Sequence, residues 1–183
     1  MDPIGFAEAI KYYRGKKVFL TGHTGFKGSW LTLLLKKFGA EIRGFSLKPH
    51  TEPNHFTMLG IEDEINNVTG DIRNYNELKR AISEFEPEII FHLAAQAIVK
   101  NSYSDPLYTY NTNTIGTANL LEASKDINSV KSIVCITSDK CYENFEWTWG
   151  YRENDILGGF DPYSASKAAA ELVFSSYQRS FFS

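Results

Sequence analysis

The sequence has little cysteine, no excess of one charge and no long apolar run. Only Cys135 and Cys141 are present among 183 residues, which excludes a small fold held together by several disulfides. Lys and Arg total 19 against 22 Asp and Glu, for a formal net charge of -3. This balance argues against nucleic acid or an acidic membrane as a partner. No segment has the pattern of a signal peptide or a membrane-spanning helix, so we expect a cytoplasmic protein with reduced thiols.

What the sequence does have is an alternation of short apolar runs and helical periodicities. We expect strands over residues 17–21, 41–47, 65–69, 88–93 and 131–137. We expect helices over residues 27–38, 75–85, 106–125 and 162–182, with residues 144–161 as a structured loop. This alternation predicts an α/β fold of Rossmann type, a doubly wound parallel sheet with helices on both faces. The predicted domain covers residues 1–183. No His, Cys and Asp residues have metal-ligand spacing, so no metal is expected.

Three glycines, Gly22, Gly25 and Gly28, lie between the first strand and the first helix in "TGHTGFKGSW". Here a tight turn, a close approach of the backbone to a pyrophosphate and close helix packing would each need glycine. The position predicts dinucleotide binding, against the alternative of a plain tight turn. Other predicted cofactor contacts in this loop are Thr24, Phe26 and Lys27. Lys27 and His23 could touch the pyrophosphate or face solvent.

The acidic residue that normally follows such a loop at the end of the second strand is missing. Ser46 stands there and could bond a ribose hydroxyl, whereas Arg43 or Lys48 could meet a 2′-phosphate,. The loop alone therefore leaves NAD and NADP open. Asp71 is expected beside the adenine or, alternatively, as a helix N-cap or turn residue. Further predicted cofactor contacts are Ile72, Leu93, Ala94 and Ala95.

The chemistry is expected at the carboxyl ends of the fourth and fifth strands, in "TSDKCYEN" and "DPYSASKAAAE",. The pattern Tyr-x-x-x-Lys occurs four times in the chain, so the pattern alone carries no weight. Only Tyr163 and Lys167 follow the fifth strand and open a helix, where side chains four residues apart share a face. A cation at that spacing favours the phenolate form of tyrosine. His92, on an apolar strand, is expected to be a core residue.

Several segments together resemble the extended short-chain dehydrogenase/reductase superfamily. They are "TGHTGFKGSW", "HLAAQ", "NTIGTANLLEA", "TSDKCYEN" and "YSASK". Within it, "GHTGFKGSWL" and "SDKCYEN" are most similar to the CDP-glucose 4,6-dehydratases. Members of that family continue into a smaller C-terminal nucleotide-sugar domain. The resemblance therefore implies that this chain stops before the substrate domain, and that the complete protein is a cytoplasmic homodimer acting in lipopolysaccharide O-antigen biosynthesis.

The resemblance also implies a reaction and a role for each residue. Such enzymes use NAD to oxidise C4 of a hexose linked to a nucleotide, here CDP-glucose, then expel water across C5 and C6 and return the hydride to C6. Tyr163 matches the base for the C4 hydroxyl, Lys167 its partner, and Ser138 the group that orients O4. Tyr163 and Lys167 are also implied as cofactor contacts, Lys167 at the nicotinamide ribose. Asp139 matches the acid that protonates the departing hydroxyl. Lys140 is expected to remove the C5 proton or to stabilise the enolate, with an ordinary surface lysine as the alternative.

Other functions stay open. A 4-epimerase or dehydrogenase of the same superfamily would need Tyr163 and Lys167, but would not need Asp139 with an acid/base neighbour. A nucleotide-binding fragment without turnover is the third alternative. "SDK" favours dehydration.

Overall fold

All the strands of this computed structural model, which describes residues 5–182, are parallel and form one sheet. In sequence order they are β1 (Lys17–Thr21), β2 (Glu41–Ser46), β3 (Asn66–Thr69), β4 (Ile89–His92) and β5 (Ser132–Cys135). In space their order is β3-β2-β1-β4-β5. The chain thus winds outward from β1 in both directions, and the predicted Rossmann fold is confirmed. The order in which the chain adds strands reverses between β1 and β4, and folds of this type bind their ligands at that point.

The helices agree with the predicted ones to within about a residue at most ends, but three short α-helices and two 3-10 helices were not predicted. In order they are α1 (Phe6–Tyr13), α2 (Phe26–Lys37), α3 (His55–Leu59), α4 (Tyr75–Phe85), α5 (Val99–Ser104), α6 (Pro106–Tyr110), α7 (Gly116–Ser124) and α8 (Pro162–Phe181). Short helices η1 (Glu62–Glu64) and η3 (Asp139–Cys141) are of 3-10 type, and η2 (Asn111–Ile115) is a π-helix. The helix expected over 106–125 therefore forms without a break in helical structure, but its middle turn, η2, is a π turn between α6 and α7. The unpredicted α1, α3 and α5 have eight residues or fewer, too short to give a clear period.

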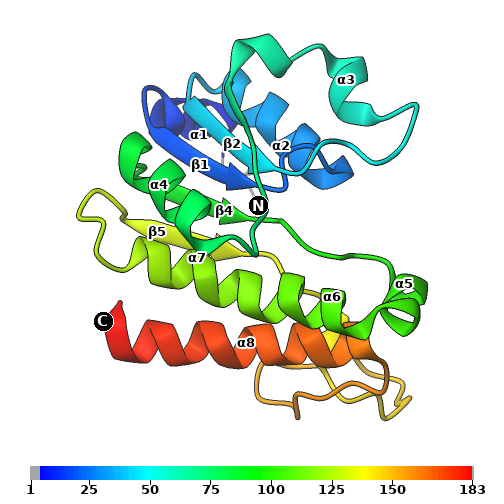
Figure 1. Ribbon diagram of the computed structural model, residues 1–183. Coiled ribbons are helices and arrows are strands. Elements are labelled where there is room, and N and C mark those ends of the chain that lie inside the picture. Colours follow the sequence, from blue (N-terminus) through cyan, green and yellow to red (C-terminus); the bar gives the residue numbers. More distant parts are fainter. Residues whose placement is uncertain (1–4, 183) are drawn as a thin grey trace.

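The two faces of the sheet are covered by different helices (Figure 1). Side chains alternate along β1, because successive residues of a strand point to opposite faces. Phe19 packs with Leu78 of α4 and Leu120 of α7, whereas Val18 and Leu20 pack with Leu35 of α2. The near-continuous apolar run of β1 follows from this burial on both faces.

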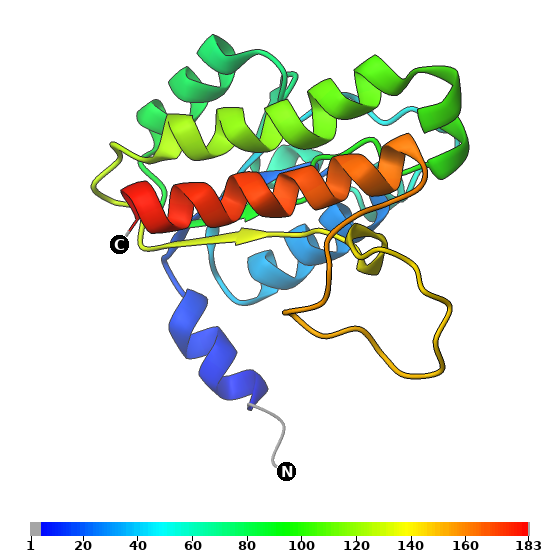
Figure 2. The same ribbon diagram turned by 90° about the horizontal axis from the view of Figure 1, so that it is seen from below.

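Helix α8, red in Figure 2, runs alongside α6 and α7 and contacts both. Tyr177 of α8 donates a hydrogen bond to Glu122 of α7 at 3.0 Å, and α8 also contacts η2 and η3. These contacts place the start of α8 at the carboxyl end of the sheet. Within residues 5–182, no helix combines the length and the apolar character that crossing a bilayer requires.

A buried chain of hydrogen bonds joins β1, β4 and α7 through His92. The Thr117 hydroxyl donates to the Asn113 carbonyl at 2.6 Å, so it accepts from His92 Nε2 at 3.0 Å. Nδ1 of His92 then accepts from the Thr21 hydroxyl at 2.7 Å. Burial, with a smaller effect of the Lys167 charge, lowers the pKa of His92 to about 3. His92 is the core residue that the sequence predicted, held as a neutral imidazole.

We predict that this histidine makes folding stability depend on pH. The folded-state pKa lies below the unfolded value of about 6.5,. The stabilisation is therefore complete above pH 6.5 and is lost as pH falls toward 3. His92 contributes a slope of up to about 1.4 kcal/mol per pH unit to the free energy of unfolding between pH 6 and 4. Urea unfolding at several pH values measures this slope.

His92→Gln should flatten the slope, whereas His50→Gln, at an exposed position, should leave it unchanged. His23 contributes with the same sign, because burial lowers its pKa, and accounts for a residual slope. An unaltered slope in His92→Gln would show that the imidazole is not buried as a neutral group.

Candidate functional site

The glycine-rich loop connects β1 to α2 and folds back on itself. Gly22 has φ +73°, a left-handed conformation that glycine adopts without strain. Its amide donates to the carbonyl of Phe45 in β2 at 3.0 Å. A Cβ on Gly22 would lie 2.7 Å from the backbone nitrogen of Ala94. The first glycine therefore serves both the turn and the close approach of β4.

The second and third glycines differ in what surrounds them. A Cβ on Gly28 would lie 2.1 Å from the carbonyl oxygen of Gly22, so Gly28 lets α2 pack onto the loop. Gly25 is exposed, and its Cβ would meet only that same oxygen, at 3.3 Å. Packing inside the chain thus explains Gly22 and Gly28 but leaves Gly25 unexplained. Gly25 is also the N-cap of α2, where unpaired backbone N–H groups favour an anion.

His23 lies inside the loop and does not face solvent, so that alternative is wrong. Its ring is fully buried and packs edge-on against Phe56 of α3, with centroids 5.2 Å apart. Nε2 donates to Asn67 Oδ1 of β3 at 2.7 Å, and Nδ1 has no hydrogen-bond partner. A Cβ on Gly44 would lie 2.5 Å from the ring. His23 therefore holds the loop in place by packing against β2 and by hydrogen bonding to β3.

Thr24 and Ser46 join the loop to the end of β2. The Thr24 hydroxyl donates to the carbonyl of Leu47 at 2.9 Å, so it accepts from the Ser46 hydroxyl at 2.8 Å. Phe26 and Lys27 are exposed on the first turn of α2, and the Phe26 ring lies 5.4 Å from that of His55. These predicted cofactor contacts thus surround the N-terminus of α2.

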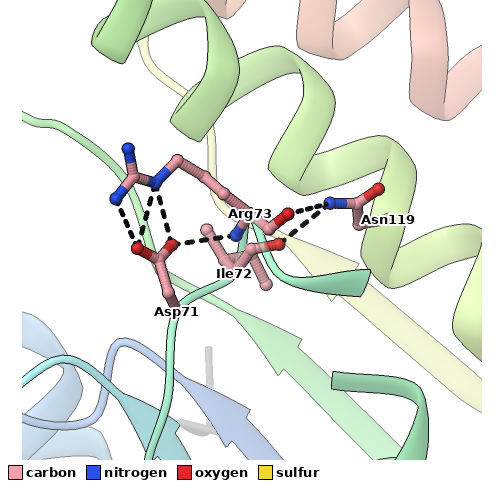
Figure 3. A network of polar contacts seen from close by, with 4 residues as sticks. All are labelled: Asp71, Ile72, Arg73 and Asn119. Atoms are coloured by element: carbon pink, nitrogen blue, oxygen red, sulfur yellow. Dashed lines mark hydrogen bonds and ion pairs between the residues drawn. The ribbon is translucent and has the colours of Figure 1, made fainter. Parts of the chain in front are cut away.

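Asp71 follows β3 in a turn held by Arg73 (Figure 3). Its carboxylate accepts from the Arg73 backbone at 2.9 Å and from the guanidinium at 2.5 Å. These bonds lower the pKa of Asp71. The N-cap of α4 is Asn74, so Asp71 is a turn residue and the N-cap alternative is wrong. Ile72 is buried, and its carbonyl accepts from Asn119 at 3.1 Å.

The segment after β4 contains Leu93, Ala94 and Ala95 and lies against the glycine loop. The Thr21 hydroxyl oxygen accepts from the amides of Leu93 and Ala94, each at 3.2 Å. All three predicted cofactor residues are half-buried. The Thr21 hydroxyl, which also donates to His92, therefore sets the position of this segment relative to β1.

Asn113 and Gln96 are residues that the sequence analysis did not single out. Asn113 is buried in the π turn, where its side-chain oxygen accepts from the Gln96 amide at 2.8 Å. Its side-chain nitrogen donates to the Gln96 carbonyl and, at 2.8 Å, to the Ser166 hydroxyl of α8. Asn113 thus connects the segment after β4 to Ser166 of α8, which lies three residues after Tyr163. The segments "HLAAQ" and "NTIGT" contained these residues, but no spacing rule related them.

The turn that follows β5 contains Ser138, Asp139 and Lys140, where η3 begins. The Ser138 hydroxyl accepts from the Lys140 amide at 3.2 Å and donates to Asp139 Oδ1 at 3.1 Å. Asp139 and Lys140 are exposed, whereas Cys141 is buried behind them. The turn therefore presents a hydroxyl, a carboxylate and an ammonium at the carboxyl end of β5.

Tyr163 and Lys167 lie on the first turns of α8, and both are buried. Asp161 caps the helix by accepting from the Ser164 amide at 3.0 Å, and Pro162 occupies a first-turn position. Burial lowers the pKa of Lys167. Because α8 packs against η3, all five predicted catalytic residues lie at the same end of the sheet.

Comparison with known proteins decides the family. Residues 19–182 match the model of the GDP-mannose 4,6 dehydratase family. The chain belongs to this family. It is 52% identical over 171 residues to CDP-glucose 4,6-dehydratase of Salmonella typhimurium, a match that covers 93% of this chain and 48% of that protein.

Solved structures of related enzymes have the same fold. A dTDP-glucose 4,6-dehydratase from Streptomyces venezuelae with NAD bound gives a TM-score of 0.80 at 26% identity, covering 90% of this chain and 52% of that one. A UDP-glucose 4-epimerase from Thermus thermophilus in complex with NAD gives 0.78 at 30% identity, covering 91% and 52%. The chain spans about half the length of these members of the dehydratase and epimerase group.

The different surroundings of Gly25 and Gly28 predict different effects of the same substitution. Gly28→Ala should lower the free energy of unfolding by about 1–3 kcal/mol, because its methyl group collides with the rigid Gly22 backbone,. Gly25→Ala should lower it by less, about 0.5–1 kcal/mol, because alanine is a poorer N-cap than glycine,. Urea unfolding measures both. Equal stabilities of the two variants would contradict the assignment of Gly28 to helix packing.

Proposed function

We propose that the complete protein is a lyase that uses NAD to convert CDP-glucose to CDP-4-keto-6-deoxyglucose and water. The observation that carries this proposal is the arrangement at the carboxyl end of β5. The turn after β5 carries Ser138, Asp139 and Lys140. Helix α8, whose first turns carry Tyr163 and Lys167, packs against this turn. The identity of 52% to a CDP-glucose 4,6-dehydratase supports the choice of substrate.

The residues around the glycine loop fit NAD. Gly25 is exposed, and nothing within the chain other than one carbonyl approaches it, so the pyrophosphate can reach the N-terminus of α2. Asp71 and Ile72 would lie at the adenine end, and Ser46 near the ribose. The segment of Leu93, Ala94 and Ala95 would border the nicotinamide half, with Thr24, Phe26, Lys27 and Gly28 along the phosphates. When bound, NAD supplies the reversible hydride acceptor for the sugar.

The side chains of this protein handle the protons. The ammonium of Lys167 stabilises Tyr163 as a phenolate, and this phenolate accepts the proton of the C4 hydroxyl and becomes a neutral phenol. Ser138 holds O4 by a hydrogen bond. Formation of the C4 ketone acidifies the C5 proton, which is otherwise too weakly acidic to remove. Asp139 then gives a proton to the C6 hydroxyl as it leaves, and water is the product.

Lys140 acts on C5, either as the base or as the cation that stabilises the enolate. Its exposed position next to Asp139 lets a lysine and a carboxyl group approach the same pair of sugar carbons. A 4-epimerase does not expel the C6 hydroxyl of its substrate, so it has no use for this pair. The pair therefore favours dehydration over epimerisation.

We further propose that the enzyme works in the cytoplasm as a homodimer, in the synthesis of O-antigen sugars. The large exposed apolar side chains of Leu107, Ile115 and Leu172 on α6, η2 and α8 support an interface between these helices of two copies. An interface would cover these positions, which the chain's own packing leaves exposed.

A first test concerns the cofactor. Gly25→Val should weaken NAD binding by about tenfold or more, because its side chain projects where the pyrophosphate must approach. Gly150→Val is the matched control, since a Cβ there meets nothing within 4 Å. Titration calorimetry with NAD measures both affinities. Equal affinity for Gly25→Val and the unaltered chain would refute the placement of the phosphates.

A second test separates the catalytic steps in the full-length protein. Tyr163→Phe should slow the appearance of reduced nicotinamide absorbance by about a hundredfold or more, because the first proton has no acceptor. Asp139→Asn should still give that absorbance and exchange the C5 hydrogen with deuterated solvent, while water loss slows. Lys140→Met should slow both exchange and water loss without abolishing oxidation.

Stopped-flow absorbance and deuterium incorporation by mass spectrometry record these steps. Asp126→Asn, at an exposed position, is the control for a lost carboxylate. Dehydration by Lys140→Met at the unaltered rate would refute the role of Lys140. Loss of the absorbance change in Asp139→Asn would assign Asp139 to the oxidation instead.

A further inference from the structure

Glu171 shares a face of α8 with the two buried catalytic residues. Tyr163, Lys167 and Glu171 are spaced four residues apart, which stacks their side chains along one side of the helix with about 5–6 Å between successive Cβ atoms. Glu171 is half-buried, and its carboxylate accepts a hydrogen bond from the Thr137 hydroxyl at 2.5 Å. Thr137 immediately precedes Ser138, so this bond ties α8 to the catalytic turn.

Lys167 is a buried cation that needs a compensating charge. The residue is 6% exposed, and burial lowers its pKa. Among the described residues, no carboxylate forms an ion pair with it within 4 Å. A buried ammonium without compensation tends to lose its proton. The groups that face Lys167 therefore determine whether it stays charged.

Of those groups, Glu171 is the one carboxylate among the described residues. Burial raises the pKa of Cys135 on β5 to about 12 and raises that of Cys141 on η3, so both are neutral thiols. His92 on β4 is a neutral imidazole, with a pKa of about 3.

We propose that Glu171 is a positioning residue: its carboxylate, held by Thr137, keeps the ammonium of Lys167 charged and directed along α8 toward Tyr163. This role rests on the proposed function, because it matters to catalysis only if Lys167 supports Tyr163 as a base. The Thr137 hydrogen bond fixes the carboxylate behind Lys167, on the side away from Tyr163. The carboxylate thereby stabilises the cation without competing for the phenol.

The direct test is the titration of Lys167 in this chain, without NAD or substrate. Lysine labelled with 13C at Cε gives a signal for Lys167 that is identified by its loss in Lys167→Met. Glu171→Gln keeps the side-chain length and the acceptor for Thr137 but removes the charge. Lys167 should then lose its proton at lower pH than in the unaltered chain. An unchanged titration would overturn the proposal.

Two further variants make the result specific. Glu122→Gln is the matched control, because Glu122 also accepts from a hydroxyl of this region, that of Tyr177, yet belongs to α7; it should leave the Lys167 titration unchanged. Thr137→Val frees the carboxylate and should shift the titration in the same direction as Glu171→Gln. If Glu171→Gln did not fold, an unchanged titration in folded Thr137→Val would overturn the proposal.

The catalytic consequence is measured in the full-length enzyme. Glu171→Gln should slow the appearance of reduced nicotinamide about tenfold, with KM within about threefold of the unaltered value. The pH above which this rate falls should also move down, in step with the titration. A shifted titration with no dehydratase activity in any form would refute the proposed function and leave the Glu171–Lys167 coupling intact. A rate with an unaltered pH profile in Glu171→Gln would overturn the catalytic role.

Discussion

The buried hydrogen bonds from Thr21 through His92 and Thr117 to Asn113 are the interaction on which the rest of the site depends. They connect β1, β4 and the helix that crosses them, at the end of the sheet where the chain changes direction. Each group in the series has a defined donor or acceptor role, because the Thr117 proton goes to the Asn113 carbonyl. Protonation of His92 would leave a charge and an unmatched donor inside the sheet, and the cost of that change is what keeps the ring neutral.

Much of the fold follows from local sequence, because strands buried on both faces leave apolar runs and long helices leave a period. The glycine loop was also predictable, since its place between β1 and α2 gives each glycine a reason. The sequence could not predict where His23 points, because its environment comes from Gly44, Phe56 and Asn67 on three other elements. The pairing of Gln96 with Asn113 was hidden for the same reason: the two residues meet only after β4 and the helix are packed.

The five catalytic candidates were accessible from sequence because each follows β5 or opens α8, and the fold rule for parallel sheets places both at one edge. Their electrostatics were not accessible. Whether Lys167 is charged depends on its burial and on thiols, an imidazole and a carboxylate brought from β5, β4, η3 and α8. In the proposed mechanism Lys167 must remain charged in a buried place, so the proposed role of α8 depends on its packing. The elements that stabilise the fold would then also tune the proton chemistry.

The π turn at Asn111–Ile115 has a consequence for how this helix can change over evolution. A π turn holds one residue more than an α-helical turn, so it takes up the extra residue within a single wide turn while the α-helical segments on either side keep their register. Deleting one residue there would restore a regular helix and leave Leu120 in the core beyond it. The residue displaced would be Asn113, which lies inside the turn and bonds Gln96 and Ser166. Lineages that keep these amide contacts must therefore also keep the extra residue, whereas the core alone does not require it.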